Sequence, residues 1–176
     1  SFTDEKQLAA DHIVLRKSGE GLAWGSVYVQ YTLPLDEVRS ASNGLSIVRR
    51  WEIKKGEAWQ PLADGSTVDA GATLRQVITI SADRDLDFVS VKASRPAGLE
   101  PLTALSGYEW ESGAYHAVRD ASDEYFYRKF PKGKLTFTVE GRAMRIGTFR
   151  SGLVRAQSQY APEYSAFAPS FTLTVK

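Results

Sequence analysis

Six acidic side chains gather in the middle of the chain, and paired carboxylates are the groups that most enzymes use to hydrolyse glycosidic bonds. They are Glu100, Glu109, Glu111, Asp120, Asp123 and Glu124. A working pair needs its carboxyl groups within about 10 Å of each other in space. Spacing along a loop does not set that separation, and most such groups are simply exposed. A hydrolase built on this segment is therefore the least favoured function.

A second acidic group has the spacing of the first ligands of a calcium-binding loop. It consists of Asp83, Asp85 and Asp87. Such a loop also needs Gly at its sixth position and a bidentate Glu at its twelfth. Those positions hold Phe88 and Ser94. We therefore interpret the stretch as a solvated acidic turn between two strands and predict no metal site.

Other signatures of catalysis or cofactor binding are missing from the sequence. Without cysteine the chain has no disulfide, thiolate metal site or cysteine nucleophile. His12 and His116 are the only histidines, and neither belongs to a His-Glu-x-x-His pair. Gly19 and Gly21 form only a fragment of the dinucleotide-binding fingerprint, whose sixth position is Trp24. There is no Gly-x-Ser-x-Gly elbow. We predict no catalytic residue and no cofactor.

Four tryptophans are candidates for binding a ligand or a partner. Trp24 and Trp51 lie on alternating stretches, where packing in the core is the favoured role. Trp59 and Trp110 lie near turns, so a display role and a packing role are about equally favoured. An exposed aromatic ring can stack on a sugar or grip another protein. Trp59 and Trp110 are therefore the predicted binding surface.

Charge and length limit the partners. The chain has 176 residues with 22 basic and 21 acidic side chains, a net charge of +1. Nucleic-acid binding requires a clustered excess of Lys and Arg, so we predict no nucleic-acid partner. No run of about 18 apolar residues could span a bilayer, so we predict no direct membrane insertion. The chain opens at Ser1, without an initiator Met or an apolar signal region, which indicates a piece of a larger or processed protein.

The pattern of apolar residues predicts an all-β fold. Short alternating stretches, bounded by Gly, Pro and Asn turns, follow one another without a segment of sustained helical periodicity. Eight or nine such strands indicate an antiparallel β-sandwich of immunoglobulin-like type. Residues 94–113 are expected to form a long irregular connection, because five Gly and Pro residues interrupt them. We divide the chain into an N-terminal segment, residues 1–42, and the sandwich, residues 43–176.

The rest of the chain leads to the stretch 147–166. Gly147 and Gly152 are expected to bend the chain into a strand on which Val154, Ala156 and Tyr160 share one face. Pro162 closes that strand, because it lacks an N–H for the ladder. Tyr160 beside it is predicted to anchor the corner, and replacing it by Ala should cost about 3 kcal/mol if its ring is buried.

Four segments, taken in order, resemble one protein family. They are Ala23–Tyr31, Asp83–Val89, Arg95–Pro101 and Gln159–Tyr164. Together they resemble the C-terminal macroglobulin (MG10-like) domain of bacterial alpha-2-macroglobulin proteins, in particular the long Bacteroidetes-type chains. The resemblance covers most of residues 22–176, including the hairpin at Pro131–Gly133 and the terminal strand. The order of the segments, rather than any one motif, makes it specific.

The resemblance implies a non-catalytic module of an extracytoplasmic, multidomain endopeptidase inhibitor that traps proteases after its bait is cut. Its expected partners are neighbouring domains of the same chain and, through the parent protein, target proteases. It also implies that residues 1–42 belong partly to the tail of the preceding region. The family's thioester motif uses Cys and its animal receptor site uses lysines on a helix. Because this sequence has neither, no functional residue carries over. The alternative is a carbohydrate-binding or adhesion sandwich of a surface protein.

Overall fold

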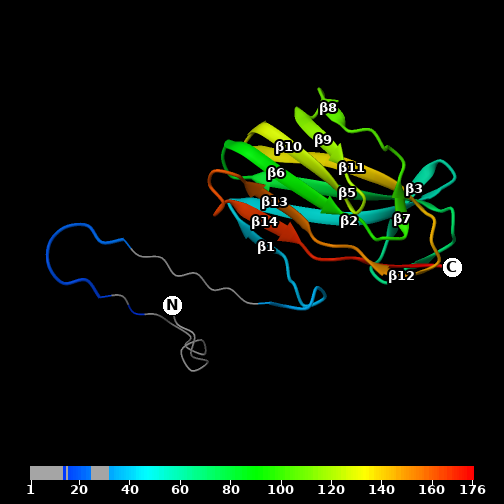
Figure 1. Ribbon diagram of the computed structural model, residues 1–176, viewed down its shortest axis with the longest axis horizontal. Coiled ribbons are helices and arrows are strands. Elements are labelled where there is room, and N and C mark those ends of the chain that lie inside the picture. The colour runs from blue at the N-terminus through cyan, green and yellow to red at the C-terminus, as the bar shows by residue number, and fades with distance from the viewer. Residues whose placement is uncertain (1–13, 15, 25–31) are drawn as a thin grey trace. The chain divides into compact units, whose positions relative to one another are not determined.

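A computed structural model describes residues 14, 16–24 and 32–176 (Figure 1). Two units are distinguished, residues 1–32 and residues 33–176. The alternating stretch that begins at Trp24 falls mostly outside the described residues. Trp24, predicted to pack, is exposed. The described part of the chain forms strands and turns, and it contains no helix that is long and apolar enough to cross a membrane.

Fifteen strands build the second unit, almost all of them antiparallel. They are β1 (Ala41–Asn43), β2 (Leu45–Lys55), β3 (Ala58–Leu62), β4 (Thr67–Val68), β5 (Thr73–Ala82), β6 (Leu86–Ser94), β7 (Leu99–Pro101), β8 (Gly107–Glu109), β9 (Ala114–Val118), β10 (Ser122–Phe130), β11 (Gly133–Ala143), β12 (Gly147–Arg150), β13 (Val154–Ser158), β14 (Ser165–Ala168) and β15 (Thr172–Val175).

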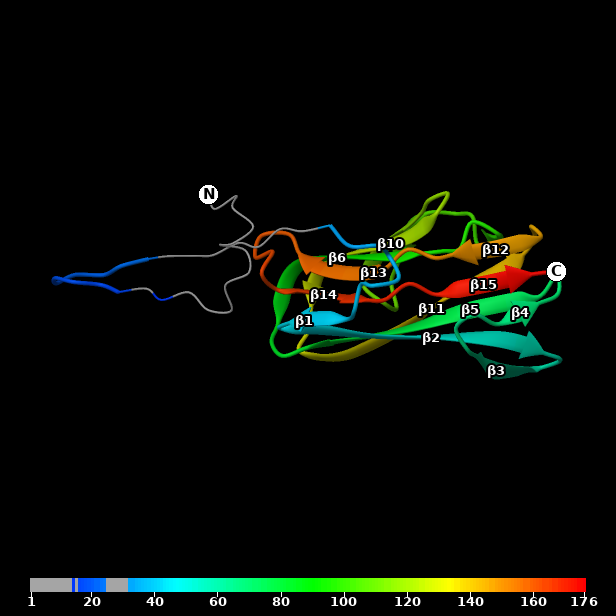
Figure 2. The same ribbon diagram turned by 90° about the horizontal axis from the view of Figure 1, so that it is seen from below.

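The large sheet folds over on itself to give two facing layers, seen edge-on in Figure 2. Its order is β7-β11-β5-β2-β1-β14-β13-β6-β10-β9-β8, with β3 paired to β2. The first layer holds β7, β11, β5, β2 and β3. The second holds β14, β13, β6, β10, β9 and β8. The short β1 joins them, through three pairs with β14 and one with β2. The all-β antiparallel sandwich predicted from the sequence is therefore confirmed.

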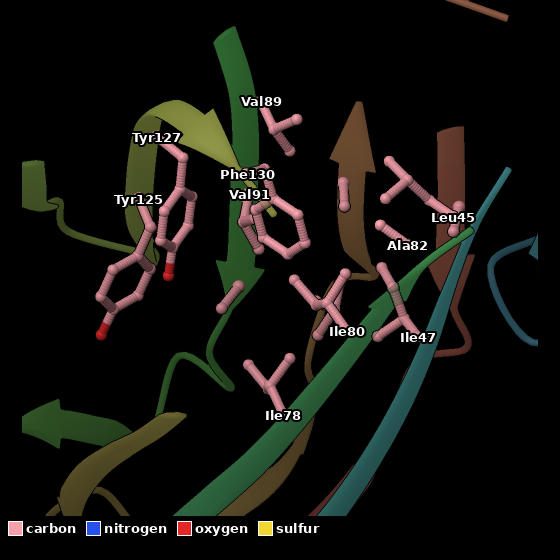
Figure 3. Close-up of a cluster of buried hydrophobic side chains, with 14 of the residues drawn as sticks. Leu45, Ile47, Ile78, Ile80, Ala82, Val89, Val91, Tyr125, Tyr127 and Phe130 are labelled. Carbon is pink, nitrogen blue, oxygen red and sulfur yellow. The ribbon is translucent and has the colours of Figure 1, made fainter. Parts of the chain in front are cut away.

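The main core lies between the two layers (Figure 3). Ile78 and Ile80 of β5 are fully buried in the same cluster as Val89 and Val91 of β6, and the ring of Phe130 belongs to this cluster. Burying an aliphatic side chain of this size contributes about 1.5–3 kcal/mol. The alternation on β2 and β5 that predicted these strands is thus the alternation that fills the core.

A second core lies under a small sheet of order β12-β15-β4, in which β15 and β4 are parallel. Its centre is Trp51, whose ring stacks on Phe171 with 4.8 Å between centroids. Leu74, Leu173 and Val175 complete the buried contact. Trp51 therefore packs in the core, as its place on an alternating strand predicted.

The strand number exceeds the predicted eight or nine. The additional strands, such as β4, β7 and β8, have two to five residues, too few for an alternating pattern to show. The segment 94–113, predicted to be irregular, contains β7 and β8. Strand β7 pairs with β11 at the edge of the first layer, through Leu99 opposite Ala143. The compact unit begins at residue 33, and β1 spans the boundary predicted at residue 42.

Candidate interaction surfaces and a buried charge network

Two segments of the chain pass side by side between the small sheet and the large one. Residues 151–153 lead from β12 into β13, and residues 169–171 lead from β14 into β15. This place is called the crossing below. At the crossing, the N–H of fully buried Ser151 donates to the carbonyl of Phe171 at 2.8 Å. The N–H of Phe171 donates to Ser151 Oγ at 3.0 Å. These reciprocal bonds satisfy backbone groups where both ladders are interrupted.

The guanidinium of Arg49, on β2, binds both segments at this crossing. Its Nη1 donates to the carbonyl of Gly152 at 3.3 Å, and its Nη2 donates to the carbonyl of Pro169. Burial lowers the pKa of Arg49 to about 10. Arg49 interrupts the apolar face of β2 in the sequence, and the carbonyls of the crossing explain why a cation is placed there.

Gly147 and Gly152 lie at the two ends of the segment leading into β13. Gly147 begins β12 with a φ of +142°, a backbone conformation that other residues rarely adopt. Gly152 lies at the crossing, where a Cβ would come within 2.7 Å of Ser94 Oγ and 2.8 Å of Ser94 Cβ. Gly147 is therefore required by its backbone conformation, and Gly152 is required because the backbone there lies close to Ser94 of β6.

The loop between β13 and β14 places its two tyrosines differently. Tyr160 is 79% exposed, so the burial on which its predicted cost depended is not met. Tyr164 is the ring that packs against the core. Its hydroxyl accepts a bond from Arg84 at 2.9 Å, and its ring covers Gly44, where a Cβ would meet it at 2.3 Å. The carbonyl of Pro162 accepts a bond from the Gln157 side chain at 3.2 Å.

The exposed ring of Tyr160 meets one other aromatic side chain. It contacts Phe88 edge-on, with 5.0 Å between the ring centroids. Phe88 has a φ of +50°, which is uncommon for a bulky residue and carries a strain cost of about 1–3 kcal/mol. The N–H of Gln159 donates to the carbonyl of Phe88 at 2.9 Å and so holds this conformation.

Trp59 and Trp110 belong to different layers. Trp59, on β3, is half-buried, and the guanidinium of Arg75 lies 4.2 Å from its ring centroid. One ring face is therefore already occupied by a cation of the same chain. Trp110 follows β8 in the second layer and is 87% exposed. The two rings lie on separate layers, and their predicted binding role stays a prediction.

The acidic side chains of the middle segment are mostly engaged by cations. Glu100 lies 4.0 Å from Arg145, and Glu124 lies 3.6 Å from Lys92. Asp123 is buried and pairs with Arg95. Sequence spacing gave no sign of these partners, because each pair joins residues that only the sheet pairing brings together.

A buried chain of charged groups runs from Arg95 to the surface at Glu109. Arg95 donates to Asp123 and to the carbonyl of Arg119. His116 lies between the acids, with Nε2 2.9 Å from Asp123 Oδ1 and Nδ1 2.9 Å from Glu109 Oε1. An imidazolium donates to both carboxylates, whereas a neutral ring can donate to only one.

The ring of His116 also stacks on Tyr125, with centroids 4.3 Å apart. Ser112, a hydroxyl side chain beside this chain of groups, bonds Glu109 at 3.1 Å instead of the imidazole. A nucleophile paired with a base requires the hydroxyl to contact the imidazole. The basic and acidic groups of this chain therefore pair with one another, and their role at the edge formed by β8, β9 and β10 is structural.

The acidic turn also directs its carboxylates to separate partners. Asp83 bonds Arg84, Asp85 accepts the N–H of Lys132 at 2.7 Å, and Asp87 pairs with Lys129 at 2.6 Å. Within residues 14, 16–24 and 32–176, no cluster of three or more His, Asp or Glu side chains could hold a metal ion.

The two layers of the large sheet and the small sheet together form an antiparallel β-sandwich domain. The family model described as the bacterial alpha-2-macroglobulin MG10 domain matches residues 44–163, so the chain belongs to this family. The resemblance identified from the sequence is thereby confirmed at the level of the family. A comparison with curated proteins gives no significant match.

Solved structures with this fold include alpha-2-macroglobulins of Salmonella and Escherichia coli. Salmonella alpha-2-macroglobulin reacted with methylamine has 25% identity and a TM-score of 0.62 over 78% of this chain. The native Escherichia coli protein has 19% identity and a TM-score of 0.66 over 82%. The Escherichia coli protein activated by porcine elastase has 19% identity and a TM-score of 0.67 over 81%. This chain spans only 10%, 10% and 14% of those three chains, respectively.

Proposed function

We propose that the chain is a non-catalytic structural and interaction module at the C-terminal end of a bacterial alpha-2-macroglobulin-like protease trap. The family match carries this proposal. It is supported by the relatives, among them a native Escherichia coli chain in which the matching fold covers only 10% of the length. The parent protein is proposed to be extracytoplasmic and of the Bacteroidetes type. Residues 1–42 are proposed to belong partly to the preceding region.

The proposed mechanism is that the module moves as a rigid body. Its fold resembles the native Escherichia coli protein and the elastase-activated one equally well, with TM-scores of 0.66 and 0.67. Two separate cores and the doubly bonded crossing at Ser151 give the domain its own internal stability. A rigid domain transmits a rearrangement of its neighbours without unfolding.

The test uses the parent protein with and without residues 1–176, mixed with a broad-specificity protease. Cleavage is followed on a large protein substrate and on a small peptide substrate. We expect the intact parent to block cleavage of the large substrate only, because a physical cage leaves the active site of the protease open to peptides. Removing the module should abolish this size discrimination. If neither form distinguishes the substrates by size, the proposal is wrong.

A further inference from the structure

The exposed aromatic side chains of the sandwich lie on one layer. Among described residues 33–176 there are six, with exposed fractions between 43% and 87%. They are Phe88, Tyr108, Trp110, Tyr115, Phe126 and Tyr160. All belong to β6, β8, β9, β10 or the loops that join the strands of the second layer. Along the strands of the first layer, the exposed large apolar side chain is Val48.

Four of these residues form a continuous patch, called the aromatic face below. Tyr108, Tyr115 and Phe126 are direct cross-strand neighbours on β8, β9 and β10. Trp110 contacts Tyr108 edge-on with 4.7 Å between centroids. Strands β8, β9 and β10 lie together at one edge of the sandwich (Figure 1). The neighbours of Tyr115 on β9 and of Phe126 on β10, such as His116, are buried, so the strand period directs these two rings outward.

The size of the aromatic face suits a protein interface. At about 150–250 Å² for each aromatic side chain, its exposed parts offer roughly 450 Å². That area equals the largest apolar patch of a typical monomer and is about half of what one partner contributes to a standard interface. Interface centres are enriched in Tyr, Trp and Phe in the same way.

A cationic depression borders the aromatic face. It has a volume of about 220 Å³ and is lined by Phe126, Lys92, Arg155, Glu124 and Gln157. Lys92 and Arg119 both lie within 3.7 Å of Glu124 and compensate its charge. In the described part of the chain, Arg155 bonds the Gln157 side chain and pairs with no carboxylate. The depression therefore has excess positive charge and complements a carboxylate.

We propose that the aromatic face and this depression dock a neighbouring folded domain of the same multidomain chain, one that presents apolar side chains beside a carboxylate. The proposal rests on the proposed function, because it needs a longer parent chain. The matched relatives carry about nine-tenths of their length outside this domain. A covalently linked neighbour has an effective concentration in the millimolar range, so a patch of moderate area is sufficient.

Hydroxyl-radical footprinting tests this proposal without using a protease. Oxidation of Trp110 and Tyr115 is compared between the isolated 176-residue chain and the uncleaved parent protein. We expect an approximately tenfold lower oxidation rate in the parent, because a central interface ring loses nearly all its exposure. Equal rates in both forms would overturn the proposal, as would protection that appears only when an oligosaccharide is added or when the isolated chain self-associates at high concentration.

Charge reversal provides the second measurement. In the parent, Lys92→Glu combined with Arg155→Glu should restore oxidation of Trp110 to within about twofold of the isolated chain, because like charges at an interface repel. The matched control is Lys54→Glu with Lys55→Glu, two exposed cations of β2 in the other layer, which should leave the protection unchanged. Equal effects of the two pairs would refute the charge complementarity. A parent that fails the trap test but keeps Trp110 protected would refute the proposed function and not the docking.

Discussion

Replacing Gly152 by Ala tests how closely the crossing packs on β6. The added Cβ would lie 2.8 Å from Ser94 Cβ and 2.7 Å from Ser94 Oγ. Rotating the Ser94 side chain can move the hydroxyl but not the Cβ, which is bonded to the backbone. The strands must therefore separate by several tenths of an ångström, at a point where Arg49 and the Ser151 bonds hold the crossing in place.

The expected magnitude follows from this geometry. Overpacking at a well-packed site costs about 1–3 kcal/mol, and Gly152→Ala should fall in that range. For a domain of this size, each kcal/mol lowers the Tm by roughly 2–4 °C. The control is Gly107→Ala, where a Cβ meets nothing within 4 Å. It should change the free energy of unfolding by no more than about 0.5 kcal/mol.

A double-mutant cycle with Ser94 identifies the cause. Ser94→Gly removes the Cβ that Gly152→Ala would contact, so the two changes together should recover at least about half of the loss, measured against Ser94→Gly alone. Ser94→Ala retains the Cβ and should recover little. Urea unfolding followed by tryptophan fluorescence measures all variants. Equal recovery by Ser94→Ala and Ser94→Gly, or no loss in Gly152→Ala, would refute the reasoning.

Three further outcomes are expected. Asp123→Asn should lower the free energy of unfolding by about 3–5 kcal/mol in chemical denaturation, because it leaves a buried guanidinium without its carboxylate. Tyr164→Ala should cost about 2–3 kcal/mol in the same assay, whereas Tyr160→Ala should cost less than about 0.5 kcal/mol, because only the first ring packs on the core. Burial raises the pKa of Tyr125 and Tyr127 above that of tyrosines in the unfolded chain, which is about 10. Their contribution to the free energy of unfolding should therefore be fully present below about pH 10 and should decrease as the pH rises further.

Each of these outcomes has a control and a contrary result. Asp83→Asn breaks an exposed pair and should cost no more than about 1 kcal/mol, so a loss equal to that of Asp123→Asn would contradict the role of burial. Equal losses at the two tyrosines of the loop would contradict their different packing. Tyr127→Phe should reduce the alkaline loss at little cost in stability, because the Tyr127 hydroxyl has no hydrogen-bond partner among the described residues. An unchanged alkaline slope would contradict its raised pKa.

The sequence alone determined the class of the fold and its longest strands. The alternation of Leu45, Ile47, Trp51 and Ile53 marks the buried face of β2, because side chains point to opposite faces of a strand with a period of two. The absence of Cys excluded disulfides and cysteine nucleophiles, and the net charge of +1 led us to predict no nucleic-acid partner. The ordered segments also identified the family. These properties follow from residue type and local spacing.

Only the tertiary structure decided which strands pair and therefore which side chains meet. Tyr160 and Tyr164 flank the same proline, and their roles differ because Gly44 and Arg84 approach one ring from distant parts of the chain. The aromatic face could not be predicted for the same reason. Tyr108 lies on a three-residue strand with no pattern of its own, and only the register opposite Tyr115 forms the row. The strand period fixes which face a residue occupies, whereas its neighbours depend on pairing across loops of any length.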